Sequence, residues 1–458
     1  MMYFKKIKII ATVLLIGFAV GCEDLIEVNP PKAQLITTAV FENAGTANAA
    51  IVDIYARMRD SGLTSGTING LTYLLGNYSD ELEYHSSNID VLSLYNHTHV
   101  ASNASIARIW NTAYGQIYAA NSIIEGLQNT TAIPIDTKNQ LMGEALFIRG
   151  YLHFYLTNVF GAIPYVTSTN YKLNSSIDKE TESQIMQFIT NDLLEAEKLL
   201  PKAYSSFERV RPNKAVATAL LSKIYLFTGD WQKAELYSTT IIDNPIYKIE
   251  NIANVFLLNS QETIWEFHPG IAGVNTNEAR TFVFTSGPPT KAYLAKNLIN
   301  AFELGDNRKN LWIKKITSGA NSWYHAWKYK KTTNTGTSQE YTILFRLAEQ
   351  YLIRAEARTM QNKLSAAQLD LNKIRSRAAL PNTMAQTQEE LLIAIMHERQ
   401  VELFTEQGNR WFDLKRTGAA NGVIGAIKPE WKPTDILWPL PEKEVLLNKN
   451  LLPQNSGY

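Results

Sequence analysis

Apolar residues recur with the 3.6-residue period of an α-helix along most of this chain. The sequence shows no regular alternation of strands with helices, which argues against a doubly wound α/β fold. We therefore predict a mainly α fold. The segments with helical periodicity are 43–60, 103–128, 137–158, 181–200, 213–228, 231–243, 290–303, 340–361, 364–378 and 387–406.

Two stretches between these helices differ in composition. Residues 244–289 and 312–340 are rich in Pro, Gly, Asn, Ser and Thr with scattered aromatic residues, which is typical of loops and short hairpins. Within the first stretch, 263–267 (TIWEF) alternates in the manner of a short strand. The loop-rich part of the chain is predicted at about 61–100 and 244–340.

Small residues recur twelve positions apart in two of the predicted helix pairs. Ser222 precedes Ala234 by this offset, and Ala355 precedes Ala367 by the same offset. The spacing is typical of tetratricopeptide repeats, in which small residues let two helices approach closely. The alternative is a set of generic antiparallel helix pairs. We predict tetratricopeptide-like units within about 103–243 and 340–380.

The start of the chain has the composition of an export signal. Lys5, Lys6 and Lys8 precede an apolar run at 9–20, which is too short to span a bilayer. Cys22, the only cysteine of the 458 residues, follows this run closely. We therefore predict a lipoprotein signal peptide at 1–21 and attachment of a diacylglycerol to the Cys22 thiol. The alternative is a plain secretory signal with an incidental cysteine.

The charge pattern argues against several functions. Lysine and arginine number 44 and aspartate and glutamate 43, a balance that gives no electrostatic footprint for nucleic acid. Glu398 and Glu402 lie one helical turn apart among arginines, which favours an ion-pair network over a catalytic acid–base pair. His97 and His99 have no carboxylate or cysteine at ligand spacing, so we place them in a surface loop. We expect no metal, no cofactor and no enzymatic activity.

Several blocks of sequence resemble the SusD/RagB-like nutrient-binding lipoproteins of Bacteroidetes. The resemblance covers nearly the whole chain, and the charged block before residue 417 is its most specific part. The blocks are CEDLIEVNPP at 22–31, EALFIRGY and FGAIPY within 144–165, HER and GNRWFDLKR within 397–416, and LWPLP with the tail that follows it at 437–458.

The resemblance implies a SusD-like fold for 22–458 as a single domain, in which tetratricopeptide-like units scaffold an irregular ligand-binding part. It implies a protein that is lipid-anchored in the outer membrane and captures an oligosaccharide or polysaccharide. A SusC-like TonB-dependent barrel would receive the ligand. Glu23 and Asp24 resemble the acidic tag of lipoproteins that face the outside. The alternatives are a peptide ligand, as in RagB-type members, and a surface-anchored glycoside hydrolase that uses Asp80 or Glu81.

The resemblance also indicates where the ligand would bind. It implicates the segment between the first helix and the first repeat unit, together with a later loop. Sugars need aromatic rings for their C–H faces and acids or amides for their hydroxyls. The alternatives are that the rings pack beneath loops and that Asp80 and Glu81 cap a helix or bind a structural cation. The candidate ligand-binding residues are Tyr73, Asp80, Glu81, Tyr84, Tyr95, Asn96, Arg280, Trp323 and Tyr324.

Overall fold

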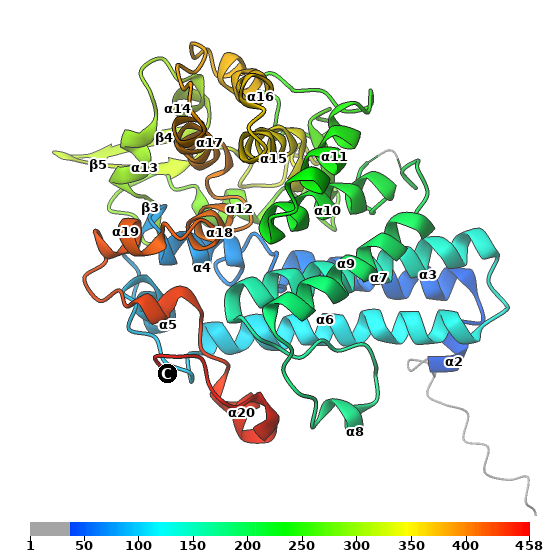
Figure 1. Ribbon diagram of the computed structural model, residues 1–458. Helices are drawn as coiled ribbons and strands as arrows, with labels where there is room; N and C mark the ends of the chain where they lie inside the picture. Colours follow the sequence, from blue (N-terminus) through cyan, green and yellow to red (C-terminus); the bar gives the residue numbers. More distant parts are fainter. Residues whose placement is uncertain (1–36, 207) are drawn as a thin grey trace, which may run out of the picture.

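The computed structural model describes residues 37–206 and 208–458 (Figure 1). The predicted signal peptide and Cys22 lie outside the described residues. Helices dominate the architecture, as the sequence predicts, and four of the longest lie side by side. No helix in the described ranges is long and apolar enough to cross a membrane. The four helices are α3 (Ala44–Asp60), α6 (Ala104–Asn129), α7 (Ile135–Phe160) and α9 (Glu182–Leu199).

Local signals fix where these helices begin. At the start of α6, the Asn103 side chain accepts hydrogen bonds from the backbone N–H groups of Ser105 and Ile106. Thr181 and Gln184 form a capping box at the start of α9. On α7 every residue from 143 to 160 is buried, because α6 and α9 pack against it. This helix is therefore the centre of the layer.

Two further helix pairs carry the small residues at twelve-residue spacing. The first is α10 with α11 and the second is α15 with α16, and α11 also packs against α15. Ser222, Ala234, Ala355 and Ala367 are completely buried, as close approach of helices requires. The assignment of these pairs to tetratricopeptide-like units remains a prediction. The helices are α10 (Lys214–Thr228), α11 (Trp231–Ile242), α15 (Leu347–Met360) and α16 (Leu364–Arg377).

The strands form three antiparallel pairs. The strand predicted at 263–267 is confirmed as β2, which pairs with β6. The helix predicted from 340 is wrong at its start, because β6 occupies those residues before α15 begins. The helix predicted at 290–303 is likewise replaced by β3 and the short α13. The strands are β1 (Leu82–Glu83), β2 (Thr263–Phe267), β3 (Tyr293–Leu294), β4 (Ile313–Ser318), β5 (Asn321–Ala326) and β6 (Thr342–Arg346).

The loop predicted across 61–100 contains two helices. All eight residues of α4 are buried, so this helix lacks the amphipathic period that reveals a helix in sequence. The other is α5, whose first turn is capped by Asn88. The remaining helices are α2 (Thr37–Val40), α4 (Leu71–Tyr78), α5 (Ile89–Tyr95), α8 (Tyr171–Asn174), α12 (Asn277–Phe282), α13 (Lys296–Ala301), α14 (Asn307–Leu311), α17 (Gln388–Leu403), α18 (Asn409–Arg416), α19 (Ala420–Gly425) and α20 (Glu442–Leu447).

A buried ion-pair cluster joins several of these elements. Glu402 of α17 accepts hydrogen bonds from Arg308 (2.9 Å), Arg346 (2.5 Å) and Arg377. Burial alone would raise the pKa of Glu402, but the three arginines together hold this pKa well below its usual range. The predicted ion-pair network is therefore confirmed. The cluster consists of Arg308, Arg346, Arg375, Arg377, Glu262, Glu398, Glu402 and Glu406.

The surface position predicted for two histidines is wrong. His97 and His99 are buried, and the rings of both lie against Tyr78 of α4. The His97 imidazole also lies 3.0 Å from the Tyr78 carbonyl oxygen. These rings fill the space between α4 and the C-terminal segment around Asp435. Within the described residues, no group of His, Cys, Asp and Glu side chains could hold a metal ion.

We expect Glu402→Gln to lower the free energy of unfolding by about 3–5 kcal/mol. The substitution removes the one carboxylate charge that the three buried arginines share, and each arginine keeps only its outer partners, which include Glu262 and Glu398. Chemical unfolding followed by circular dichroism measures the change.

Asp53→Asn is the matched control. Asp53 and Arg57 form an ion pair of 2.6 Å in which the side chains are 51% and 57% exposed. Breaking such a pair costs less than about 1 kcal/mol. Equal losses in the two variants would contradict a special role for the cluster.

Candidate ligand-binding site

Three strands bring distant parts of the chain together at one edge of the molecule. β1 pairs with β3, so that Glu83 lies opposite Tyr293, and β3 lies against β5. The backbone N–H of Ala295 extends this pairing by donating to the carbonyl oxygen of Glu81 (2.8 Å). β3 therefore lies between two groups of predicted ligand residues, those next to β1 (Glu81 and Tyr84) and those on β5 (Trp323 and Tyr324).

Aromatic rings gather along these strands. The rings of Tyr84 and Tyr95 lie 6.3 Å apart, and those of His85 and Tyr293 stack at 5.2 Å. Tyr84 is buried beneath Tyr95, whereas Tyr95 and Tyr293 are half-buried and His85 is exposed. Trp323 of β5 is also half-buried, and β5 lies against β3. We call Tyr84, His85, Tyr95, Tyr293 and Trp323 the aromatic edge.

Hydrogen bonds fix the rings of β1 and β3. The Tyr293 hydroxyl donates to the Glu83 carboxylate at 2.6 Å, and the His85 imidazole lies 3.1 Å from the same hydroxyl. Burial and the bond to Glu83 both raise the pKa of Tyr293, so its hydroxyl keeps its proton. The geometry holds two rings and one carboxylate in a single arrangement.

A lysine packs against Tyr95 of the aromatic edge. The Lys428 ammonium lies 3.2 Å from the centroid of the Tyr95 ring. Burial lowers the pKa of Lys428 to about 7. Asn96 ends α5 directly after Tyr95, and its side chain is exposed. An amide and a titratable amine therefore flank the same ring.

The hairpin of β4 and β5 carries the remaining aromatic candidates. The indole of Trp323 lies so close to Gly287 that a Cβ atom at this glycine would overlap with the ring. Tyr324 points to the opposite side of the strand, with the Lys315 ammonium 6.0 Å from its ring centroid. Arg280 is exposed on α12, where it donates to Asn277 (2.7 Å) beside a separate small hollow near Arg59.

Three predicted ligand residues have structural contacts instead. Asp80 is 3% exposed and accepts two hydrogen bonds from Arg410 (2.8 and 2.7 Å). Glu81 is 1% exposed and accepts the backbone N–H of Thr405 at 3.2 Å. The hydroxyl of Tyr73, which is 3% exposed, accepts the backbone N–H of Ala292. These side chains support β1 and β3 from below.

The pKa of Glu81 bears on the hydrolase alternative. Burial and the neighbouring Asp80 raise it to about 8, a direction typical of a general acid. A glycosidase also needs two carboxylates about 5–10 Å apart across an accessible cleft. Glu81 is enclosed and its neighbour Asp80 is paired with Arg410, so their geometry offers no open acid–base pair.

Comparisons with known proteins identify the family of this chain. The family model described as "Starch-binding associating with outer membrane" matches residues 26–226, and the model described as "SusD family" matches 274–458. SusD-like protein P2 of Formosa agariphila is 28% identical over an alignment that covers 99% of this chain and 100% of the relative. The chain belongs to the SusD/RagB family.

Solved structures of the SusD superfamily share the fold. One from Bacteroides vulgatus has a TM-score of 0.78 at 21% identity, covering 91% of this chain and 100% of its own. A laminarin-binding SusD-like protein has a TM-score of 0.76 at 24% identity, covering 90% and 99%. A SusD-like carbohydrate-binding protein from Bacteroides fragilis has a TM-score of 0.78 at 20% identity, covering 90% and 99%. The predicted mainly helical, SusD-like fold is confirmed.

Sequence reasoning missed four residues of this candidate site: Glu83, His85, Tyr293 and Lys428. Glu83 and His85 flank Tyr84, and alternation along 82–85 is the signal that could have drawn attention to them. Tyr293 fell within a predicted helix. Lys428 follows a short helix, and no local pattern connects it with Tyr95.

The depressed pKa of Lys428 predicts a pH-dependent cost to stability. Below about pH 7 the lysine is protonated in both the folded and unfolded chain, so the full cost of burying its charge is present. The cost shrinks as the pH rises toward the ordinary value of 10.5. The parent should therefore gain stability between pH 6 and pH 9, whereas Lys428→Met has no amine to titrate. Over this range the free energy of unfolding of Lys428→Met, relative to that of the parent, should fall by about 2 kcal/mol in thermal and chemical unfolding.

Lys198→Met is the control for this comparison, because the Lys198 side chain is 73% exposed. Its stability relative to the parent should not change over the same pH range. Parallel pH profiles for the parent and Lys428→Met would contradict the buried, neutralised lysine.

Proposed function

We propose that this protein captures an oligosaccharide or polysaccharide at the outer-membrane surface and passes it to a SusC-like TonB-dependent barrel. The aromatic edge carries the proposal, because it combines half-buried rings with hydrogen-bonding groups on a supported strand ribbon. The likeness to a laminarin-binding SusD-like protein supports a glycan as the ligand class. The family's description as associating with the outer membrane supports the location.

The proposed mode of binding follows from the chemistry of the edge. Sugar C–H faces stack on Tyr95, Tyr293 and Trp323, and hydroxyl groups bond to Glu83 and Asn96. Support from below keeps these side chains in place before the ligand arrives, which reduces the entropic cost of binding. The site binds its ligand without cutting it, because Asp80 and Glu81 are enclosed and already bonded.

Replacing Tyr95, Tyr293 or Trp323 by alanine should weaken glycan binding by more than about 1 kcal/mol for at least one residue, since a few aromatic anchors usually dominate an interface. Calorimetry with laminarin and a panel of other polysaccharides measures the loss. Tyr171→Ala is the control, because Tyr171 is 73% exposed on α8, away from the aromatic edge.

Three results would contradict this proposal. Unchanged affinity in all three variants would place the glycan elsewhere. Binding of peptides in place of every glycan would favour the RagB-type alternative. Release of reducing ends from a bound glycan would favour the hydrolase alternative.

The lipid anchor rests on Cys22 and is tested separately. Cys22→Ala removes the thiol that would carry the diacylglycerol, so the protein should move from the membrane fraction to the soluble fraction. Detergent-phase partitioning of cell lysates measures this shift. A mutant that stays in the detergent phase would contradict the anchor, and protease treatment of intact cells tests whether the protein faces outward.

A further inference from the structure

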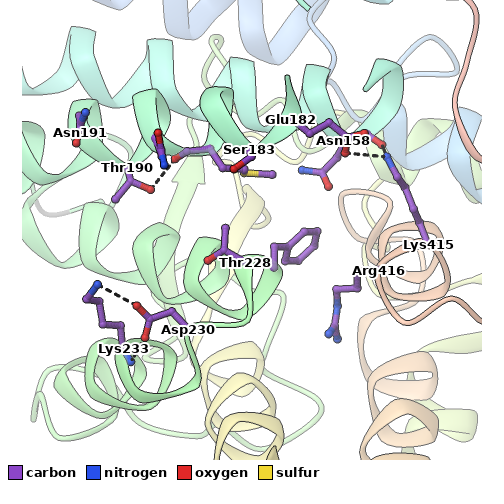
Figure 2. Close-up of a pocket in the computed structure, with 13 residues that line it drawn as sticks. Asn158, Glu182, Ser183, Thr190, Asn191, Thr228, Asp230, Lys233, Lys415 and Arg416 are labelled. Carbon is purple, nitrogen blue, oxygen red and sulfur yellow. Dashed lines mark hydrogen bonds and ion pairs between the residues drawn. The ribbon is translucent and has the colours of Figure 1, made fainter. Parts of the chain in front are cut away.

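A polar cleft lies between helices, and no residue of the aromatic edge lines it. Its cavity is about 720 Å³, with α9 on one side and α18 on the other, and it extends over the turn between α10 and α11 (Figure 2). Amides of Asn158, Gln187 and Asn191 and hydroxyls of Ser183 and Thr228 line it. These groups can both donate and accept hydrogen bonds, as a peptide backbone requires.

An apolar groove of about 900 Å³ continues this cleft. The two hollows share Phe227, Thr228 and Arg416 as lining residues, so they adjoin, and we call the pair the helical cleft. The groove passes between α15, α17 and α19, and aliphatic side chains form much of its lining, together with the rings of Phe227 and Trp231. Leu226, Leu392, Ile393, Met396, Leu414 and Val423 belong to it. Aliphatic walls with methionine accommodate branched side chains of varied shape.

The cations of the helical cleft differ in how they are neutralised. Lys233 pairs with Asp230 at 2.9 Å, and Arg416 pairs with Glu356 and Asp413. Arg410 is held by Asp80, as described above. Each of these cations already has a close carboxylate.

Lys415 is the exception among the cations that line the cleft in the described chain. Its ammonium donates to the Asn158 carbonyl oxygen at 2.8 Å, but its nearest carboxylate, Glu182, is 3.9 Å away and half-exposed. An ammonium has three donors, so capacity for a further acceptor remains. Burial lowers the pKa of Lys415, which an anion beside it would oppose.

We propose that the helical cleft binds a peptide segment with a carboxylate next to aliphatic side chains. The carboxylate lies at Lys415, and the aliphatic side chains enter the groove lined by Met396 and Leu414. The carboxylate comes from a chain terminus or from an acidic residue. Phe227 and Trp231 also line the groove, so a glycan is the competing occupant, and the peptide is favoured because the aliphatic side chains of the lining outnumber these two rings.

This site goes beyond the glycan function and shares no lining residue with the aromatic edge. The two proposals can therefore fail independently. Loss of glycan binding in the tyrosine and tryptophan variants says nothing about the cleft, and the converse also holds.

Calorimetry on the purified protein tests the proposal with three acetylated tetrapeptides. The first is Ala-Leu-Ile-Leu with a free terminal carboxylate, the second is its terminal amide, and the third is Ala-Leu-Asp-Leu amide. We expect the free-carboxylate or aspartate peptide to bind about tenfold more tightly than the uncharged amide, and the stronger of the two identifies the source of the carboxylate. Lys415→Met should abolish that difference while leaving the affinity for the uncharged amide unchanged.

Two further variants keep the test independent of any folding defect in Lys415→Met. Glu182→Gln removes an exposed competing carboxylate, so it should tighten binding of the charged peptide about twofold or more. Ile393→Asp, in the groove, should weaken binding of every peptide at least fivefold. Leu236→Asp is its control, because Leu236 is similarly exposed (60% against 65%) and lies outside the cleft.

Several outcomes would overturn the proposal. They are no binding of any of the three peptides, equal affinity of the charged and uncharged peptides, and equal effects of Ile393→Asp and Leu236→Asp. Displacement of the peptide by an oligomer of glucuronic acid would also overturn it, because the cleft would then recognise a charged sugar.

Discussion

The buried carboxylate of Glu402 is the interaction on which the rest of this structure depends. Arg308, Arg346 and Arg377 come from separate elements and converge on it, so α17 is held at once to α14, β6 and α16. Burying such charges costs several kcal/mol for each ion, and only dense pairing offsets this cost. The cluster therefore ties α17 to three other elements, since separating them would expose or unpair buried charges.

The same arrangement positions the proposed ligand site. The end of α17 leads through Thr405 into α18. Thr405 holds Glu81, and Arg410 of α18 holds Asp80, both next to β1. β1 in turn fixes the register of β3, which places Tyr293 beside Glu83 and His85. The rings of the aromatic edge are thus preorganised by contacts that start in the core.

The aromatic edge and the helical cleft follow different chemistry. The aromatic edge presents rings on and beside short strands, which suits the flat faces of sugars, whereas the helical cleft presents aliphatic side chains and one under-neutralised lysine. The helix pairs that carry Ser222 and Ala234 pack tightly at their centre, and the cleft opens where α10 ends at Thr228. The same two helices, α10 and α11, are therefore closely packed at their centre and open to the cleft at the turn that joins them.

The sequence alone determined the helical scaffold, the segment TIWEF as a strand, and the role of Glu398 and Glu402 in an ion-pair network. Their partners come from other elements and are not the arginines that flank them in the sequence. Helix periodicity, caps such as Asn103 and charge spacing are local properties, so they can be read without the fold. Tertiary structure decided the rest. Residues 342–346 became β6 because β2 lies beside them, Asp80 became buried because Arg410 reaches it across 330 positions, and Tyr293 joined the site through pairing with β1. Such contacts join residues far apart in the sequence, and no local pattern records which partner each residue will meet.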